Sequence, residues 1–508
     1  MEEPNNDSDN KLFIKQFSSQ FDYSRNETSI ILAAGHGKRI KSQTSKMLHK
    51  IWEVPTVERV VKACENGLAN SNVIVVAGIK AEEVVKAIGK RNFVSYALQE
   101  EQHGTGHALQ IALEKINPQE YNGTIYVFPG DMGLINVETI KFFKEEFEKS
   151  MSDMMVLTGI YEGEIEANNY GRIVRVPDPL PDKNEKNKKG VISIGHGKVV
   201  EILEYKDILN LEESKPYKFK YGKENYEYTK KELIENREFN SGVYAFKFKP
   251  LVKLINKIES NNVQKEIYLT DLIGLFNQYG YVVEAVSPKE QYVLMGFNNK
   301  SVLKEMDVIA RKLSYEKLKD IITIDDPDDF FIEEGVSEEL INKDSQGIIL
   351  DIHIGKGVYI GKGVHLNCNL RIEKNVLLEG EISFGKNVIV KNNAQISCFY
   401  GQKILIGNGV EIYRGNEIKG NVEIGDHSKI ESGVRLTGND QFPCQIGTNV
   451  TIRGLSYIYA SKVDDNIIIE HSILKKKKIS KPASSKSDIY CVRYYLPEVE
   501  GKDAVKDI

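Results

Sequence analysis

The stretch Ile30–Lys46 reads Ile-Ile-Leu-Ala-Ala-Gly-His-Gly-Lys-Arg-Ile-Lys-Ser-Gln-Thr-Ser-Lys. Its first five residues form an apolar run with the length of a buried strand. The run leads into Gly-His-Gly at 35–37, followed by Arg39 and Lys46. Glycines let a backbone approach phosphates closely, and cations offset the phosphate charge. The stretch therefore predicts a strand followed by a phosphate-binding loop. Its spacing matches neither the P-loop nor the dinucleotide fingerprint, and an ordinary turn is the alternative.

The composition of the 508 residues is typical of a soluble globular protein, with 41% hydrophobic and 28% charged residues. This length predicts at least two domains. The net charge of −5 gives no general attraction to nucleic acid or to an anionic membrane, so we expect neither as a partner. The five cysteines are odd in number and form no Cys-x-x-Cys pair. We therefore expect reduced thiols in a cytoplasm, with no zinc site and no disulfide framework.

From Ser29 to Asn298 the chain alternates short apolar runs with amphipathic segments. We predict strands at 30–34, 73–78, 93–98 and 124–128, and helices at 81–88, 106–116 and 137–147. This alternation favours an α/β domain with a mainly parallel sheet. Ligands of such sheets lie beyond the carboxyl ends of the strands, and both Gly35 and Asp131 follow an apolar run there. The charged stretches 177–190 and 210–236 are interpreted as surface insertions.

The second half of the chain repeats an aliphatic residue every six positions, with one phenylalanine among them. A period of six predicts a parallel β-helix in which three hexads make one triangular coil. We expect the coils to be left-handed, and we expect small loops near 398–403 and 438–444, where the register restarts. The seventeen positions in phase are Ile354, Ile360, Leu366, Ile372, Leu378, Phe384, Val390, Ile396, Ile406, Ile412, Ile418, Ile424, Ile430, Leu436, Ile446, Ile452 and Ile458.

Several motifs of the first half follow one another in a characteristic order. The motifs are Leu-Ala-Ala-Gly-x-Gly-x-Arg at 32–39 with Lys46, Gln-x-x-Gln-x-Gly-Thr-Gly-His-Ala at 99–108, Gly-Asp at 130–131, Tyr-Gly-Arg-Ile-Val at 170–174, Glu-Tyr-Lys-Asp at 204–207, Asn-Ser-Gly-Val-Tyr at 240–244, Glu-x-Tyr-Leu-Thr-Asp at 266–271 and Gly-x-Asn-Asn at 296–299. On these motifs the chain resembles the sugar-1-phosphate nucleotidylyltransferases joined to a left-handed β-helix, and in particular the family of bacterial bifunctional N-acetylglucosamine-1-phosphate uridyltransferase/glucosamine-1-phosphate acetyltransferases.

This resemblance implies an α/β Rossmann-like nucleotidyltransferase domain with a mainly parallel mixed sheet, followed by a left-handed parallel β-helix of hexapeptide repeats. The expected boundaries are a flexible N-terminal arm at 1–27, the nucleotidyltransferase domain at 28–300, a helical connector at 301–346, the β-helix at 347–474 and a C-terminal tail at 475–508. Members of the family associate through their β-helices, and the resemblance implies a homotrimer.

The resemblance also implies roles for particular residues. Arg39 and Lys46 would contact the triphosphate and the charge of the transition state, and Asp131 and Asn298 would hold a catalytic Mg²⁺. Of the two glutamines, Gln99 is the better candidate for recognising uracil. The nucleotide would be bound by Leu32, Ala33, Ala34, Gly35, Gln99, Gln102, Gly104 and Thr105, and the sugar by Gly171, Glu204 and Asn240.

The chemistry of the implied reaction fits these residue types. An oxygen of the sugar-1-phosphate attacks the α-phosphorus, and pyrophosphate leaves in line. The nucleophile is already an anion, so the reaction needs fixed cations, backbone donors and a hard metal ion more than a general base. Mg²⁺ takes only one or two protein oxygen ligands in such sites, which suits one carboxylate and one amide.

The expected reaction is UTP plus N-acetylglucosamine-1-phosphate giving UDP-N-acetylglucosamine and pyrophosphate. The alternatives are another base or sugar, or a non-catalytic regulatory or scaffold subunit of the same architecture. We expect no acetyltransferase activity of the familiar kind, because Gly454 stands where the family has its histidine before a Leu-Thr-Tyr-like motif.

Three of the singled-out residues have a purely structural alternative. Asp131 could cap the helix predicted from Val137, and Asn298 could cap the helix that begins near Ser301. His107 is explained well enough by hydrogen bonding at a helix start.

Overall fold

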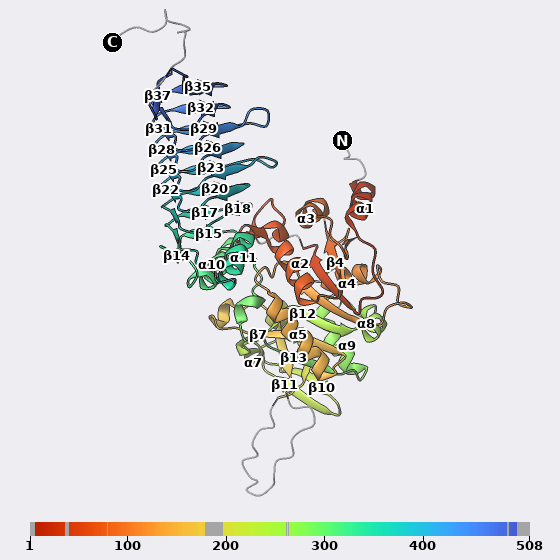
Figure 1. Cartoon of the computed structure of the whole chain (residues 1–508). Helices are drawn as coiled ribbons and strands as arrows, with labels where there is room; N and C mark the ends of the chain where they lie inside the picture. Colours follow the sequence, from red (N-terminus) through yellow and green to blue (C-terminus); the bar gives the residue numbers. More distant parts are fainter. Residues whose placement is uncertain are drawn as a thin grey trace, which may run out of the picture. The chain divides into compact units, whose positions relative to one another are not determined.

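The structure is a computed structural model that describes residues 6–35, 40–78, 80–177, 197–260, 262, 264–484 and 487–494, with side chains from Lys11 onward. The chain divides into two compact units, Met1–Met306 and Asp307–Ile508. The fold class expected from the sequence is confirmed in both units. The first contains a mixed, mainly parallel sheet with helices, and the second contains three ladders of stacked parallel strands that form a left-handed β-helix (Figure 1).

The strand β1 (Glu27–Ala33) lies inside the sheet of the first unit, between β4 and β6. It pairs in parallel with both neighbours, and β12 is the antiparallel strand between β6 and β7. In order across the sheet, the strands are β13 (Val283–Val286), β7 (Met154–Ile160), β12 (Glu238–Lys247), β6 (Thr124–Pro129), β1, β4 (Ser71–Ala77) and β5 (Val94–Leu98), with β8 (Arg172–Arg175) and β9 (Val199–Leu203) off the end of β12.

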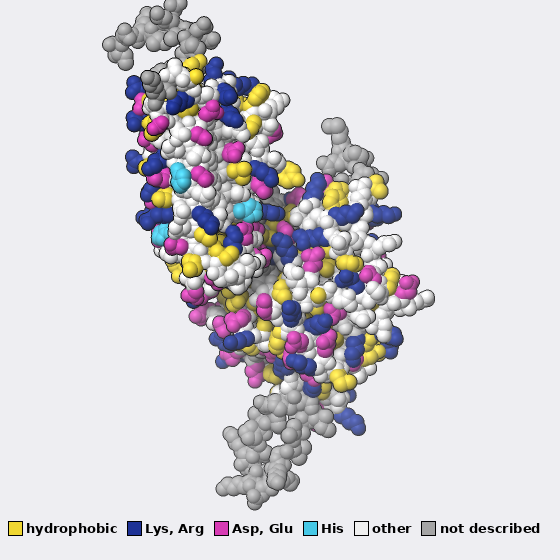
Figure 2. All heavy atoms as spheres, viewed as in Figure 1, with side chains coloured by type: hydrophobic (Ala, Val, Ile, Leu, Met, Phe, Trp, Pro, Cys, Tyr) yellow, Lys and Arg dark blue, Asp and Glu magenta, His cyan; other side chains and the backbone are white. Residues whose placement is uncertain are grey.

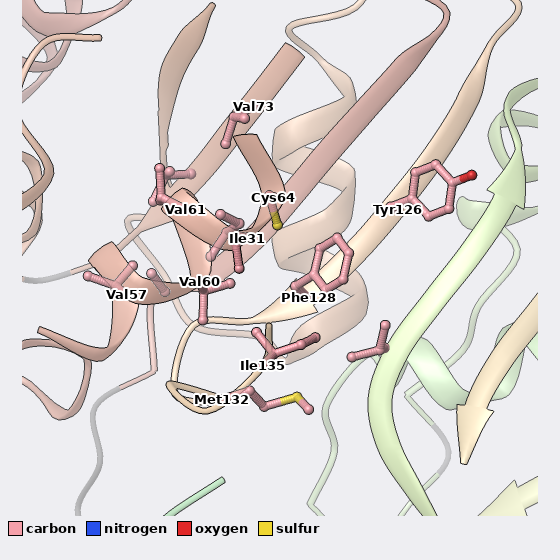
Figure 3. Packing of buried hydrophobic residues seen from close by; sticks show 14 of the residues in the cluster. Ile31, Val57, Val60, Val61, Cys64, Val73, Tyr126, Phe128, Met132 and Ile135 are labelled. Carbon is pink, nitrogen blue, oxygen red and sulfur yellow. The ribbon is translucent and has the colours of Figure 1, made fainter. Parts of the chain in front are cut away.

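Both faces of the sheet are covered. Successive side chains of a strand point to opposite faces, so the neighbours Ile30 and Ile31 enter different cores, and each is fully buried. Figure 3 shows Ile31 packed with Val57, Val60 and Phe128 on one face. That core includes residues of α2 (Thr56–Gly67), α3 (Ala81–Ile88) and α5 (Val137–Ser150), and the other includes α4 (Thr105–Leu113), α8 (Phe248–Ile255) and α9 (Leu272–Gln278).

The N-terminal region differs from the expectation. The prediction of a flexible arm at 1–27 is wrong for the helix α1 (Asn6–Phe17) and the segment after it. Ile14 is only 5% exposed and belongs to the core beside α2 and α3, and Ser19 N donates to Val94 O at 2.8 Å. The few apolar residues among many polar ones form one face of a short helix, which the overall composition of the segment concealed.

The charged stretch 210–236 is ordered in a way that its composition did not indicate. It contains the hairpin β10 (Tyr217–Tyr221) and β11 (Glu224–Tyr228), followed by α7 (Lys230–Glu235). Phe219 is 8% exposed and stacks on Tyr226 and Tyr228, so alternate aromatic residues give the hairpin an apolar face. Most of the other proposed insertion, 178–190, lies outside the described residues.

The second unit confirms the hexad pattern. All seventeen in-phase residues are buried, and none is more than 5% exposed. The first ladder is β14 (Thr323–Ile324), β16 (Ile352–Ile354), β19 (Leu370–Ile372), β22 (Ile389–Val390), β25 (Glu411–Ile412), β28 (Lys429–Ile430), β31 (Thr451–Ile452), β34 (Ile467–Ile469) and β37 (Tyr490–Val492). The second is β15 (Phe330–Ile332), β17 (Val358–Ile360), β20 (Leu377–Glu379), β23 (Gln395–Ser397), β26 (Glu417–Lys419), β29 (Arg435–Thr437), β32 (Tyr457–Tyr459) and β35 (Ile473–Lys475). The third is β18 (Val364–His365), β21 (Ile382–Phe384), β24 (Ile404–Ile406), β27 (Val422–Ile424), β30 (Cys444–Ile446), β33 (Lys462–Val463) and β36 (Lys478–Ile479).

The β-helix extends beyond the expected limits of 347–474. Before it, β14 pairs with β16 and β15 pairs with β17, so part of the expected connector at 301–346 already belongs to the ladders. The connector keeps two helices, α10 (Lys300–Leu318) and α11 (Glu334–Ser345). After it, β36 and β37 extend two ladders into the expected tail. Helix α11 interrupts the first coil, so the period of six is not visible there.

The two loops expected at the register breaks are present. They lie between β23 and β24 and between β29 and β30, and Gln402 Nε2 of one donates to Asp440 Oδ1 of the other at 2.8 Å. Figure 2 shows charged side chains of both signs over the visible face of the β-helix. No helix in the described ranges is long and apolar enough to cross a membrane.

Candidate active site

The carboxyl ends of three neighbouring strands meet at one edge of the sheet. Ala33 of β1 lies opposite Ala77 of β4, and Leu32 lies opposite Pro129 of β6. The chain leaves these ends at Gly35, Gly78 and Asp131. Gly130 N donates to Leu32 O at 3.0 Å, which holds the turn after β6 against β1. Gly35 and Asp131 therefore occupy the same edge of the sheet, as the sequence predicts.

Three of the predicted residues meet at this edge. Lys46 Nζ lies 2.5 Å from Asp131 Oδ2 and donates to Asn298 Oδ1 at 2.9 Å. The side chains of Lys46 and Asp131 are only 12% and 14% exposed, so the charges are largely shielded from water. Lys46 begins the short 3-10 helix Lys46–Leu48, whose Met47 is buried and anchors this segment in the core. The other predicted catalytic residue, Arg39, lies outside the described residues.

The capping alternatives for Asp131 and Asn298 are not what the structure shows. Helix α5 is capped by Asn136, whose side chain accepts from Thr139 N at 2.8 Å. Helix α10 is capped by Asn299, whose Oδ1 accepts from Val302 N at 2.9 Å. The oxygens of Asp131 and Asn298 instead face the ammonium group of Lys46.

The donor set of Asp131 and Asn298 suits a hard cation. One carboxylate oxygen and one amide oxygen both lie within 2.9 Å of a single ammonium nitrogen, so both can face one positive charge. A Cβ on Gly296 would lie 3.1 Å from Asp131 Oδ2, and glycine keeps that space free. Within the described ranges no group of three or more His, Cys, Asp or Glu side chains could hold a metal ion. The residues fit an ion such as Mg²⁺, which needs only one or two protein ligands.

The predicted nucleotide residues lie next to β1. Ala33 and Ala34 are buried, and Leu32 is half-buried. Gln102 Nε2 donates to Ala34 O at 2.7 Å, which joins the segment after β5 to the end of β1. Gln99 is 3% exposed, and its Nε2 donates to Gly104 O at 3.2 Å and lies 3.1 Å from His107 Nδ1. His107 thus has the structural contact expected of it, and it orients Gln99.

Gly104 and Thr105 hold the start of α4 against the segment 267–269. Gly104 has φ +104°, and a Cβ there would lie 2.6 Å from Ile267 O, so this position requires glycine. Thr105 Oγ1 accepts from Leu269 N at 3.1 Å. Both residues therefore have structural contacts that a nucleotide-binding role does not require.

The three predicted sugar residues also come together. Asn240 N donates to Gly171 O at 2.9 Å, and a Cβ on Gly171 would lie 3.3 Å from Glu204 Oε1. Asn240 Oδ1 accepts from Gly242 N at 2.9 Å and from Tyr244 Oη at 3.0 Å. The site is thus built from the turn before β8, the end of β9 and the bulge in β12.

The carboxyl group of Glu204 has an unusual environment. Burial raises its pKa to about 7, and the nearby carboxylates of Asp207, Asp271 and Glu266 add to the effect. Burial also raises the pKa of Asp271 to about 6, with contributions from Asp207 and Glu201. Glu204 can therefore exchange a proton near neutral pH, and a neutral carboxyl group can donate a hydrogen bond to a sugar.

Arg172, to which no role was assigned from the sequence, is fully buried. Its guanidinium donates to Asn168 Oδ1 at 3.0 Å and to Asn168 O at 2.8 Å, and it also contacts Tyr170 O. These bonds hold the loop that ends in Gly171. A single arginine in a Tyr-Gly-Arg-Ile motif carries no sign of burial, so only the fold reveals this positioning role.

Comparison with known proteins identifies both halves of the chain. Residues 29–165 match the MobA-like NTP transferase domain family, and residues 403–438 match the bacterial transferase hexapeptide family with six repeats. The chain is similar over most of its length to proteins named "Bifunctional protein GlmU". That of Acetivibrio thermocellus is 30% identical over 486 residues, covering 94% of this chain and 89% of the relative. That of Clostridium acetobutylicum is 31% identical over 440 residues, covering 86% and 81%.

The raised pKa of Glu204 predicts a pH-dependent stability. Between the ordinary value of 4.5 and about 7 the folded protein binds the proton more tightly than the unfolded chain, so the free energy of unfolding falls as the pH rises. Replacing Glu204→Gln removes this loss. Between pH 5 and pH 8 the free energy of unfolding of the variant, measured with urea, should therefore rise relative to that of the wild type. The rise should be about 1.4 kcal/mol for each unit by which folding raises the pKa of Glu204.

Glu212→Gln is the matched control, because Glu212 is an exposed side chain that forms an ion pair with Lys215 on the surface. The free energy of unfolding of this control should differ from that of the wild type by the same amount at pH 5 and at pH 8. A Glu204→Gln difference that is also independent of pH would contradict the assignment.

Proposed function

Because this chain belongs to the family of the bifunctional GlmU proteins and is a nucleotidyltransferase, we propose that it transfers a uridylyl group from UTP to N-acetylglucosamine-1-phosphate. The products are UDP-N-acetylglucosamine and pyrophosphate. The meeting of Lys46, Asp131 and Asn298 at the carboxyl ends of β1 and β6 carries the proposal.

The proposed reaction brings two anions together. A phosphate oxygen of the sugar-1-phosphate forms a bond to the α-phosphorus, the bond from that phosphorus to the bridging oxygen breaks, and the electron pair leaves with pyrophosphate. No proton has to be removed from the nucleophile, which is consistent with a site built around a lysine ammonium instead of a base. Lys46 and Arg39 would stabilise the charge that develops on the transferred phosphoryl group.

Asp131 and Asn298 would hold Mg²⁺, which when bound offsets the negative charge of the triphosphate. The shielded position of Asp131 supports this role, since a carboxylate away from bulk water interacts more strongly with a cation.

Two further groups of residues would orient the substrates. We assign the nucleoside to Leu32, Ala33, Ala34, Gly35, Gln99, Gln102, Gly104 and Thr105, of which Gln99 is our candidate for recognising uracil. The sugar is assigned to Gly171, Glu204 and Asn240. The bond between Asn240 and Gly171 supports the second group, because it fixes both residues beside the carboxyl group of Glu204.

Two alternatives remain open to experiment: a different base or sugar, and a non-catalytic subunit. The contacts of Lys46 with Asp131 and Asn298 argue against the second, since a silent subunit has no need to hold a cation and two oxygens together in a shielded site. The test is to incubate the protein with Mg²⁺ and a panel of nucleoside triphosphates and sugar-1-phosphates, and to measure pyrophosphate. The highest rate is expected with UTP and N-acetylglucosamine-1-phosphate, and no release with any pair would exclude the enzyme.

Removing the central groups should abolish turnover. Lys46→Ala and Asp131→Ala should each reduce the rate of pyrophosphate release by roughly 10²-fold or more, which is the usual cost of losing a preorganised charge in an active site. The control is Lys50→Ala, because Lys50 is 56% exposed and pairs with Glu53 on the surface. That variant should keep wild-type activity. Near-normal turnover of folded Lys46→Ala, with folding checked by circular dichroism, would refute the assignment.

We also infer that the β-helix lacks an acetyltransferase of the familiar kind. A Cβ on Gly454 would lie 2.8 Å from Ser432 O, so this position has no room for a histidine without a shift of the neighbouring coil. The nearby His471 belongs to the next coil, and its Nδ1 lies 2.9 Å from Gly454 O. With acetyl-coenzyme A and glucosamine-1-phosphate, we expect no release of coenzyme A thiol above the background. Release at a rate similar to uridylyl transfer would contradict this inference.

The proposed assembly is a homotrimer in the cytoplasm, and it rests on the resemblance of the β-helix to its family. Light scattering of the purified chain should then give three times the mass of 57.5 kDa. A mass of one or two chains would contradict the trimer.

A further inference from the structure

A cavity of about 160 Å³ lies at the carboxyl ends of β1 and β4. Pockets that enclose a whole small-molecule ligand have roughly 300–1,000 Å³, so this cavity suits one part of a substrate better than a whole nucleotide. The described residues that line it come from three segments: Ala33, Ala34 and Gly35 after β1, Ser42, Gln43, Thr44 and Ser45 before Lys46, and Gly78, Lys80 and Val84 at the start of α3.

The chemistry of this lining suits an anion. Lys80 is the one charged side chain among the described lining residues, and none of them is acidic. Hydroxyl groups come from Ser42, Thr44 and Ser45, and the turn that carries them is ordered by a bond from Thr44 N to Ser42 Oγ at 3.1 Å. A lysine ammonium opposite hydroxyl groups and a glycine backbone offers hydrogen-bond donors from several directions.

Lys80 is held at the cavity but keeps donor capacity. Its Nζ contacts Gln43 O, which fixes the side chain against the segment 42–45, and it lies 3.5 Å from Glu83 Oε1. Glu83 is 52% exposed, so this ion pair stabilises the protein little and compensates little of the charge. An ammonium group has three N–H donors, and these two contacts leave one for a ligand.

The position of the cavity relates it to the phosphates. Ser45 lines the cavity, and the next residue, Lys46, reaches Asp131 and Asn298, where the proposed function places the α-phosphorus. Ala33, Ala34 and Gly35 of the proposed nucleoside site line the cavity, so it adjoins that site. The two glutamines proposed near the base and the three proposed sugar residues do not line it: Gln99, Gln102, Gly171, Glu204 and Asn240. If the α-phosphate lies at Lys46, the β- and γ-phosphates need a second region with cations nearby.

We propose that Lys80 binds the β- and γ-phosphates of the nucleoside triphosphate, and therefore also the pyrophosphate that leaves. This proposal rests on the proposed function. It makes Lys80 a third cation of the site beside Arg39 and Lys46, contributed by the turn after β4. Its charge would then act on the leaving group, whereas Lys46 acts on the group that is transferred.

The test compares ligands that differ only in these phosphates. Lys80→Met keeps the length of the side chain and removes its charge, and Lys80→Arg keeps the charge. The dissociation constants of UTP, UMP and inorganic pyrophosphate, each with Mg²⁺, are measured by calorimetry on the full chain. For Lys80→Met we expect roughly tenfold weaker binding of UTP and pyrophosphate and no change for UMP, and for Lys80→Arg we expect most of the loss to be restored.

A purely structural role of Lys80, as a link between α3 and the segment 42–45, gives a different result. It would weaken UTP and UMP alike, or lower the melting temperature with no preference among ligands, and either outcome would overturn the proposal. Unchanged binding of UTP and pyrophosphate would overturn it as well. Lys86→Met is the matched control, since Lys86 is an exposed lysine of the same helix that pairs with Glu82, and it should bind all three ligands as the wild type does.

Failure of the proposed function is a separate result. It would appear as wild-type protein that releases no pyrophosphate from any pair of substrates. The comparison of pyrophosphate binding by wild-type and Lys80→Met protein requires neither a particular base or sugar nor any turnover. It therefore tests the role of Lys80 even if the proposed function fails.

Discussion

The parallel pairing of β1 with β4 on one side and with β6 on the other is the constraint on which the site depends. Residue for residue, Ala33 lies beside Ala77, and Leu32 lies beside Pro129. The three strands therefore end together, and their turns deliver a glycine loop, a lysine and an aspartate to one edge. The pairing is stable because both faces of β1 are buried, with Ile30 in one core and Ile31 in the other. A strand that moved by one residue would exchange these two faces.

The first unit treats its buried charged groups in two ways: Lys46 and Arg172 have partners of matching chemistry, and Glu204 lacks a matching cation. Lys46 is shielded, but it faces an acidic oxygen and an amide oxygen. Arg172 is fully buried, and three oxygen atoms of the loop at 168–170 accept its hydrogen bonds. Glu204 lies among other carboxylates, and its pKa rises because a buried charge without a matching cation is costly. The region around Lys46 thus holds a paired cation, whereas the region around Glu204 retains a proton to a higher pH.

The β-helix obeys a simpler rule. Apolar side chains fill the interior of each coil, and the strands of each coil pair with those of the coils beside it. Such stacking makes the unit rigid. The same tight stacking leaves no room for a side chain at Gly454 without a shift of the neighbouring coil, because the carbonyl oxygen of Ser432 would lie only 2.8 Å from its Cβ. In this unit the close approach between coils, more than any individual side chain, decides which positions could carry chemistry.

Features that depend on a local or regular pattern could be predicted from the residues alone. All seventeen residues that the hexad period selected are buried, and the apolar runs located β1, β4, β5 and β6, because strand periodicity and burial follow directly from residue type. The motifs selected Lys46, Asp131 and Asn298, but their mutual contact was visible only in the fold, since 252 residues separate Lys46 from Asn298. Composition did not reveal ordered elements in which a few apolar residues occur among many polar ones, as in α1 and in the hairpin β10–β11. Only the tertiary structure decided that Arg172 supports a loop, that Asn136 and Asn299 cap the helices, and that Lys80 lies at the cavity, because these roles depend on which distant segments the sheet brings together.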